Sequence, residues 1–130
     1  MAATDGTATR DRTYNFTNPE STIGGVRCAA DARTIDTGTI TTQVAPNIPV
    51  TVTLGYLNLR YNPICRTIWA RVALTASYAD RTVVDMVAVV RNDGVSTSAS
   101  SWFNSGLTYW SRQLNDKYFT AYARGTLYNQ

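Results

Sequence analysis

The side chains best suited to chemistry in this chain of 130 residues are two cysteines, because the sequence contains no histidine. Cys28 and Cys65 are far apart and form no CxxC spacing, so a zinc site has too few ligands. The lack of an imidazole also excludes Ser-His-Asp and Cys-His catalysis. The two thiols form a disulfide in an oxidising compartment, or they remain as buried free thiols in a reducing one.

Paired carboxylates are the other route to catalysis that the sequence leaves open. Asp31 lies near Asp36 in the chain, and Asp80 lies near Asp85. Neither spacing matches a catalytic motif, and aspartates scattered among turns mostly form turns and caps. The sequence also has no phosphate loop and no dinucleotide-binding fingerprint. We expect no enzymatic activity, no catalytic residues, no bound metal and no cofactor.

Arginine and aromatic side chains supply the remaining candidates, for binding rather than catalysis. The chain has 12 Lys and Arg against 9 Asp and Glu, a formal net charge of +3, and its only lysine is Lys117. Arginines interleaved with aromatic residues can hold a nucleic acid. Here the arginines are spread over the whole chain and the net charge is modest, so we expect no nucleic-acid partner.

The segment LRYNPICRTIWARV, residues 59–72, indicates how these side chains are positioned. It predicts a strand, a proline turn that carries a cysteine, and a returning strand. Apolar residues alternate with polar or aromatic ones along both strands, and the alternation of the first strand begins at Tyr56. One face then gathers Tyr56, Arg60, Trp69 and Arg71. We expect guanidinium groups to stack on the aromatic rings of this face, worth about 0.5–2 kcal/mol each. The face is either a rigid sheet surface or a recognition surface.

Further alternating segments continue this pattern along the chain. A hairpin is predicted over residues 39–54, and residues 82–90 read as a central strand covered on both faces. Residues 91–94 predict a turn, and strands are expected within 102–111 and 118–128. Twenty threonines and eight tyrosines suit a pleated surface. The sequence therefore predicts an all-β fold, a small antiparallel β-sandwich or barrel.

The first part of the chain lacks this periodicity. Residues 1–26 read as an extended N-terminal arm, ahead of a β domain over residues 27–130. Within the arm, Tyr14 and Phe16 alternate with small polar residues. This segment adds as a strand to a partner, forms an edge strand of its own sheet, or stays disordered. The start MAATDG reads as the mature end of a secreted protein, and no apolar run is long enough for a membrane span.

Three segments resemble one known family. CAADART (28–34), LNLRYNPICRTIWARV (57–72) and SRQLNDKYFTAYARG (111–125) are similar to segments of small secreted actinobacterial domains of unknown function. In that family the two matched cysteines are expected to pair, so the resemblance implies a Cys28–Cys65 disulfide and a secreted, extracellular protein. A looser similarity, in size and in the separable arm, is to the adaptor subunits of Streptomyces umbrella-like toxin particles.

These observations together predict a secreted, non-enzymatic binding module that is a structural or adaptor subunit of an extracellular assembly. Its partners would be other secreted proteins, and its N-terminal arm would dock on one of them. The expected partner-binding residues are Tyr14 and Phe16 on the arm, with Tyr56, Arg60, Trp69 and Arg71 on the sheet. A secreted protease inhibitor and a self-assembling coat or filament subunit are the alternatives, because each would also present an extended segment.

Overall fold

The computed structural model describes residues 14–43, 45, 47–98, 102–116 and 119–129 of the chain. The first part of the predicted arm, residues 1–13, lies outside the described residues. In chain order the elements are β1 (Thr22–Ile23), β2 (Val26–Arg27), the 3-10 helix η1 (Cys28–Asp31), β3 (Arg33–Gln43), β4 (Thr51–Asn62), β5 (Thr67–Leu74), the 3-10 helix η2 (Ala76–Arg81), β6 (Thr82–Arg91), β7 (Trp102–Ser105), β8 (Thr108–Ser111), β9 (Leu114–Asn115) and β10 (Ala121–Asn129).

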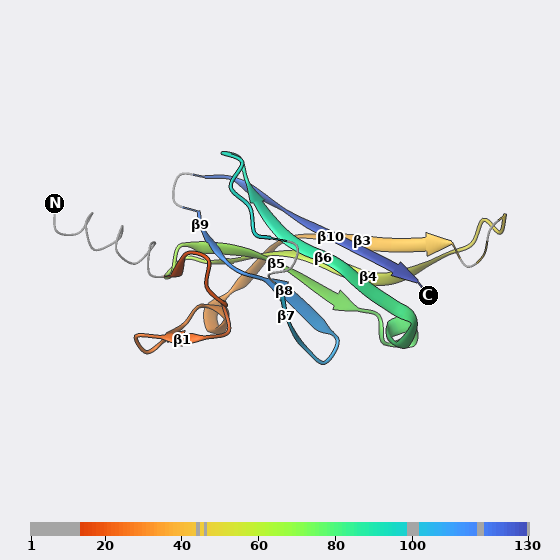
Figure 1. Ribbon diagram of the computed structural model, residues 1–130, viewed down its shortest axis with the longest axis horizontal. Coiled ribbons are helices and arrows are strands. Elements are labelled where there is room, and N and C mark those ends of the chain that lie inside the picture. The colour runs from red at the N-terminus through yellow and green to blue at the C-terminus, as the bar shows by residue number, and fades with distance from the viewer. Residues whose placement is uncertain (1–13, 44, 46, 99–101, 117–118, 130) are drawn as a thin grey trace.

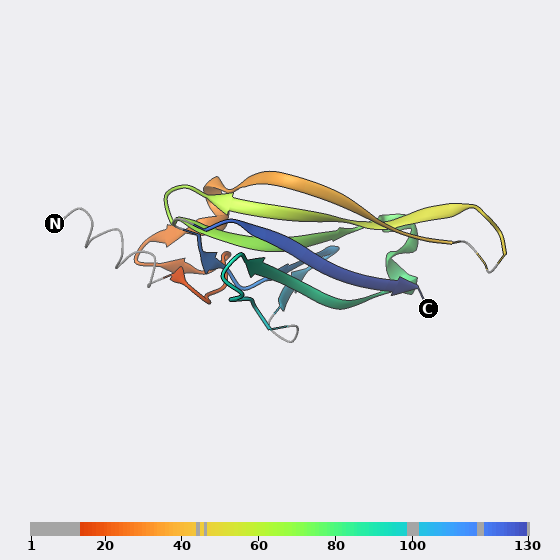
Figure 2. The same cartoon turned by 90° about the horizontal axis from the view of Figure 1, so that it is seen from above.

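The long strands form two packed layers (Figures 1 and 2). The larger layer is an antiparallel sheet with the strand order β3-β4-β5-β8-β7, and β9 also pairs with β5. The smaller layer is the antiparallel pair of β6 and β10. Figure 2 shows this pair lying below β3, β4 and β5. The expected all-β antiparallel sandwich is confirmed.

The main core lies between the two layers and follows from the alternation of the strands. On β5, Ile68, Ala70 and Val72 are buried and face β6 and β10, as the sequence predicts. Val87 and Val89 of β6 enter the same core from the smaller layer. Because both layers contribute apolar residues at every second position, the two sheets can pack face to face.

A β-bulge in β4 adjusts this pattern at Leu54. Ile40 of β3 pairs with Gly55, but Thr41 pairs with Thr53, so Leu54 has no partner in the ladder. The bulge lets Leu54 enter the main core, where it is fully buried. A side chain at Gly55 would place its Cβ 2.9 Å from the backbone oxygen of Ala73, which only glycine avoids. With Leu54 in the bulge and Gly55 in close contact with β5, residues 51–62 form the single strand β4.

The opposite face of the larger sheet is covered at one end by residues 14–32, here called the cover segment (Figure 1, red to orange). The disulfide between Cys28 and Cys65 is present, as the family resemblance implies, and it ties the cover segment to the turn after β4. A second buried cluster forms here from Tyr14, Cys28, Cys65, Trp69 and Trp110.

The turn between β4 and β5 forms where the sequence predicts it. The side-chain oxygen of Asn62 accepts hydrogen bonds from the backbone N–H groups of Ile64 (2.7 Å) and Cys65 (2.9 Å). The Asn62 amide nitrogen donates to the backbone oxygen of Cys28. Asn62 therefore shapes the turn and also joins it to the cover segment, beside the disulfide.

The cover segment corrects the predicted boundary of the N-terminal arm. The backbone N–H of Phe16 donates to the oxygen of Gln113 (2.7 Å), and the N–H of Gln113 donates to the oxygen of Thr17 (2.9 Å). The indole N–H of Trp110 donates to the side-chain oxygen of Asn18 (2.8 Å). Residues 14–26 are thus part of the folded domain, because the sheet face beneath them carries two tryptophans that require burial.

Strand β6 differs from the central strand expected over residues 82–90. Among the described strands it pairs with β10 alone. Its other edge is met by the loop that follows it, where Thr97 and Val89 exchange two hydrogen bonds and Ser96 forms a bridge with Val90. The apolar run reflects this local covering and the packing of the two layers, and not a position between two strands.

Candidate binding site

A pocket of about 460 Å³ opens on the covered face of the larger sheet, at the margin of the cover segment. Its volume is within the range of small-ligand sites, and it is partly open to solvent. The cover segment contributes one wall, and β4, β5, β7 and β8 contribute the rest. The pocket is lined by Glu20, Ala29, Arg60, Trp69, Arg71, Ser105, Thr108 and Trp110.

The register of three strands brings the main side chains of the pocket together. Arg60 lies directly opposite Trp69 in the β4–β5 ladder, and Arg71 lies opposite Trp110 in the β5–β8 ladder. Residues opposite each other in antiparallel strands share a face of the sheet. Trp69 is 2% exposed and Trp110 is 9% exposed. The two indoles therefore form a rigid base for the two arginines.

Arg71 is held by a fork of hydrogen bonds. Its Nε and Nη2 atoms both donate to the side-chain oxygen of Asn58, at 3.1 and 3.0 Å. The amide nitrogen of Asn58 donates in turn to the hydroxyl of Thr37, at 3.1 Å. Because Asn58 is itself buried, this chain of contacts fixes the guanidinium of Arg71 against the sheet. The acceptor for both Arg71 hydrogen bonds, the side-chain oxygen of Asn58, is uncharged.

Arg60 is held in the same manner from the other side. Its Nη1 atom donates to the hydroxyl of Thr34 (2.6 Å), and its Nη2 atom donates to the backbone oxygen of Ala32 (3.4 Å). Burial lowers the pKa of Arg60, and the nearby charge of Arg71 lowers it further, while Glu20 opposes both effects. Burial also lowers the pKa of Arg71, again against Glu20. Both side chains stay charged at neutral pH.

Neither arginine of the pocket forms an ion pair with any residue that the structure describes. The carboxylate that raises the pKa of both arginines is that of Glu20 on the cover segment. The Glu20 side chain itself forms an ion pair with Arg27. The pocket therefore holds two partly buried positive charges whose bound oxygens are all uncharged. Such an arrangement favours a ligand that brings a negative charge.

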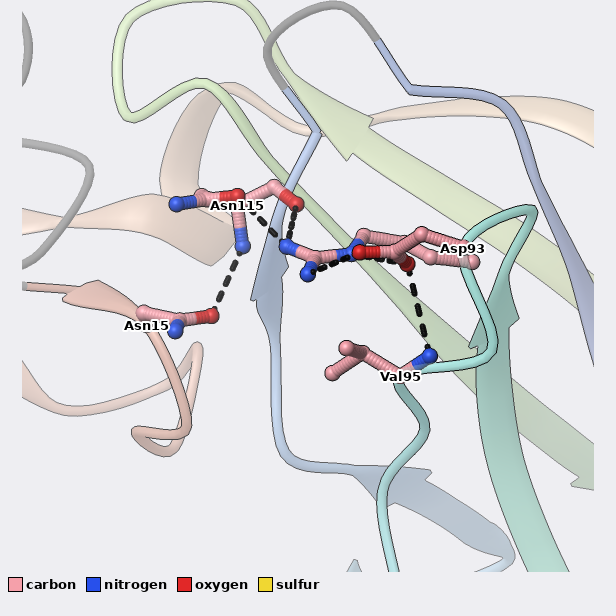
Figure 3. A network of polar contacts seen from close by, with 5 residues as sticks. Asn15, Asp93, Val95 and Asn115 are labelled. Atoms are coloured by element: carbon pink, nitrogen blue, oxygen red, sulfur yellow. Dashed lines mark hydrogen bonds and ion pairs between the residues drawn. The ribbon is translucent and has the colours of Figure 1, made fainter.

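Arg91 differs from the two pocket arginines because its guanidinium is paired with a carboxylate (Figure 3). It is 9% exposed, and its guanidinium binds both carboxylate oxygens of Asp93 at 3.0 and 2.9 Å. A third nitrogen donates to the backbone and side-chain oxygens of Asn115, at 3.0 and 2.6 Å. The side-chain oxygen of Asn15 accepts a hydrogen bond from the backbone of Asn115, so the network joins the β6 turn, β9 and the cover segment.

The Asp93 carboxylate in this network predicts a pH-dependent stability. The hydrogen bonds from Arg91 lower the pKa of Asp93, with a smaller contribution from the backbone N–H of Val95, while desolvation opposes them. Because the folded-state pKa lies below the unfolded one, the stabilisation is present above the unfolded pKa and is lost as the pH falls through the folded pKa. Asp93→Asn should lower the urea midpoint at about pH 7 and leave it unchanged at about pH 2.

The matched control for this prediction is Asp85→Asn. Asp85 is an exposed carboxylate on β6 outside the Arg91 network. Its substitution should leave the urea midpoint nearly unchanged at both pH values. A constant difference between Asp93→Asn and the wild-type protein across the whole pH range would contradict the assignment to charge.

The predicted binding residues fall into three groups. Arg60, Trp69 and Arg71 share one face, as the strand pattern indicated, and the structure shows that they also line one pocket. Tyr56 lies on the same face but farther along β4, outside the pocket lining, and is 45% exposed. Its register partners are Ala73 on β5 and Thr39 on β3.

The two aromatic residues predicted to anchor the arm have different environments. Tyr14 is 6% exposed and belongs to the buried cluster beneath the cover segment, so it is a core residue of this chain and not an exposed anchor. Phe16 is 45% exposed and has a φ of 64°, which belongs to a turn. Residues 14–17 therefore do not continue an extended strand.

The expected stacking of the sheet arginines on aromatic rings is also corrected. Arg60 and Arg71 are positioned by hydrogen bonds to neutral oxygens. Within the described part of the chain, the cation–π contacts are made by other arginines. Arg91 lies 4.1 Å from the ring centre of Phe119, and Arg112 lies 5.0 Å from that of Phe103.

Two lining residues of the pocket, Trp110 and Glu20, were not predicted as binding residues from the sequence, and neither was Asn58, which holds Arg71 from outside the lining. Asn58 lies between Tyr56 and Arg60 in the alternation, and that position was the available signal for its role. Trp110 joins the site through the pairing of β8 with β5, and Glu20 joins it through the fold of the cover segment. Neither of these long-range placements leaves a periodic pattern in the sequence.

None of the carboxylates considered for catalysis is among the residues that line this pocket. Asp31, Asp36, Asp80 and Asp85 are all exposed, on η1, β3, η2 and β6. In the described ranges of the chain, no cluster of His, Cys, Asp and Glu could hold a metal ion. No helix within those ranges is long and apolar enough to cross a bilayer.

Comparisons with known proteins place the chain in a sequence family without assigning an activity. A family model described as "Protein of unknown function (DUF2690)" matches residues 12–123. No curated protein and no solved structure matches the chain. The matched range contains the cover segment, the larger sheet, β6 and every residue of the pocket, and it ends within β10.

Proposed function

The chain belongs to the DUF2690 family of proteins of unknown function, and we propose that it is a secreted, non-enzymatic binding module, a structural or adaptor subunit of an extracellular protein assembly. The observation that carries this proposal is the pocket in which Arg60 and Arg71 lie without a carboxylate partner among the described residues. A site of this kind suits binding, because its two guanidinium groups are positioned to hold a charged group and its one carboxylate, Glu20, is paired with Arg27. The pocket replaces the N-terminal aromatic residues as the proposed partner surface.

Secretion is supported by the disulfide. A small domain with one bridge between its only two cysteines fits an oxidising compartment, where such bridges persist. The bridge holds Cys28, whose neighbour Ala29 forms part of the pocket wall. A rigid wall lowers the ordering cost of binding, which suits a subunit that must recognise a folded partner.

The finer form of the proposal is an adaptor subunit of a toxin particle. It is supported by the small size of the chain and by its compact, cross-linked β domain, which are the features shared with such adaptors. Affinity capture from the culture supernatant of the producing organism, followed by mass spectrometry, tests it directly. Large secreted subunits of one particle should be recovered together. Recovery of secreted proteases alone would favour the inhibitor alternative instead.

The capture experiment depends on one pair of substitutions. The variant with Arg60→Gln and Arg71→Gln should retain the partner about thirtyfold less well than the wild-type protein, because buried charge pairs across an interface contribute about 2 kcal/mol or more. The matched control is Arg81→Gln with Arg124→Gln, which removes the same charge from exposed positions outside the pocket. Capture by the control should equal that of the wild-type protein.

Two readouts make this comparison decisive. Thermal melts of both double variants show whether any loss of capture comes from unfolding. Equal losses in the two variants would mean that net charge alone mediates the interaction. Unchanged capture by the pocket variant would mean that the partner binds elsewhere, and the proposed function of this pocket would then be rejected.

A further inference from the structure

The positive charges of Arg60 and Arg71 are not neutralised by the groups that accept their hydrogen bonds. The acceptors for Arg71 and Arg60 are an amide oxygen, a hydroxyl and a backbone carbonyl, all of them neutral. Neutral oxygens orient a guanidinium but do not cancel its charge. Burial lowers the pKa of both side chains, which indicates that each cation is partly removed from water. An anion in the pocket would offset that loss.

The two guanidinium groups are already oriented before a ligand arrives. The contacts through Asn58 and Thr37 fix Arg71, and those through Thr34 and Ala32 fix Arg60. Each group has further N–H donors without a hydrogen bond to any described residue. Donors that are fixed in advance lose little side-chain freedom when they bind.

We propose that this pocket binds a carboxylate of a partner protein, and that Glu20 is the internal negative charge that limits the affinity for it. This inference rests on the proposed function, because it names the chemistry that the partner brings. A planar carboxylate matches the planar fork of N–H donors on a guanidinium. The carboxylate comes from an Asp or Glu side chain or from a chain terminus, which have the same chemistry.

Glu20 lowers the positive potential of the pocket and so weakens its attraction for an anionic ligand. Glu20 lines the same pocket, and its field acts on both Arg60 and Arg71. It is joined to Arg27, which reduces but does not remove its negative charge. Removing this charge should therefore strengthen the binding of a carboxylate.

Short peptides test the proposal by NMR titration of the folded, oxidised protein. Acetyl-Gly-Glu-Gly-amide presents a side-chain carboxylate, and acetyl-Gly-Gly-Ala with a free terminus presents the other source. Acetyl-Gly-Gln-Gly-amide is the neutral control. At millimolar concentrations, one or both acidic peptides should shift the indole N–H signal of Trp110 and the Nε–H signals of Arg60 and Arg71. The neutral peptide should not shift them.

Three variants separate this site from general charge effects. Arg71→Gln should weaken binding of the acidic peptide about tenfold, and Arg71→Lys should weaken it because the planar fork is lost. Arg81→Gln is the exposed control and should bind as the wild-type protein does. Glu20→Gln should bind more tightly, by about threefold for an exposed charge. If Arg71→Gln does not fold, the comparison of Glu and Gln peptides on the wild-type protein still decides the result.

Other outcomes would overturn the proposal. Tighter binding of inorganic phosphate than of both acidic peptides would show a phosphate site, and binding of tetragalacturonate alone would show a polysaccharide site. Equal shifts from the Glu and Gln peptides, or no shifts, would reject carboxylate recognition. If capture depends on Arg60 and Arg71 while no carboxylate peptide binds, the proposed function stands and this inference fails. If the peptides bind but capture is unaffected, the inference about chemistry holds and the proposed function fails.

Discussion

Replacing Cys28 and Cys65 together with alanine is expected to lower the free energy of unfolding by about 3–4 kcal/mol. The bridge closes a loop with a sequence separation of 37 residues, which restricts the unfolded chain. For a domain of this size the melting temperature should fall by about 10–20 °C. The measurement is a thermal or urea melt followed by circular dichroism, with the wild-type protein under reducing conditions as the matched control.

The reduced wild-type protein separates the covalent bond from the side chains. Reduction breaks the bridge but leaves both sulfur atoms in place, so it should reproduce most of the loss. The variant should be slightly less stable than the reduced protein, because both cysteines are fully buried and alanine fills less space. Equal stability of the oxidised, reduced and substituted proteins would contradict a stabilising role for the cross-link.

Substituting Tyr14 with alanine is expected to destabilise the domain by about 3–5 kcal/mol, the usual cost of removing a buried aromatic ring. Tyr14 is 6% exposed and packs in the cluster with Trp69 and Trp110. Phe16→Ala is the matched control, because Phe16 lies two positions away and is 45% exposed. Its substitution should change stability by less than about 0.5 kcal/mol. Urea denaturation of both variants measures the difference.

This pair of variants also decides between two descriptions of the N-terminal region. If residues 14–26 were a free arm, both substitutions would leave the melt unchanged, and both would affect only partner capture. If they belong to the domain, Tyr14→Ala alone destabilises it. A comparable loss of stability in both variants would show that Phe16 is also buried in solution and would contradict the described turn.

The sheet was predictable because its signals are local. Alternation along β5 places Ile68, Ala70 and Val72 in the core and brings Trp69 and Arg71 to the other face, which follows directly from the period of a strand. The positions of Arg60 and Arg71 on one face were predicted in the same way. The disulfide followed from the cysteine count and from the family resemblance.

The cover segment was not predictable because its contacts are remote in the sequence. Asn18 receives its hydrogen bond from Trp110, 92 positions away, and Arg112 donates to the backbone of Phe16 across 96 positions. The alternation of Tyr14 and Phe16 suggested a strand, but the positive φ of Phe16 turns the chain instead. Such contacts are set by the tertiary fold and leave no periodic signal.

The same limit explains the parts of the pocket that sequence reasoning missed. Trp110 reaches Arg71 only through the β5–β8 register, and Glu20 reaches the pocket only because the cover segment folds back. Neither pairing can be read from a single sequence, since strand order is not encoded in local alternation. The half of the site carried by neighbouring strands β4 and β5 was therefore foreseen, and the half from distant segments was not.

The irregular ladder of β3 reduces the risk of aggregation through this edge of the sheet. β3 is the outer strand of its sheet and is paired with β4 alone among the described strands. Its ladder is interrupted twice, between Thr34 and Asp36 and between Ile40 and Thr41. Such irregularities twist an edge, so that another chain cannot add along it in a straight line. This side of the molecule is therefore a poor template for fibril growth.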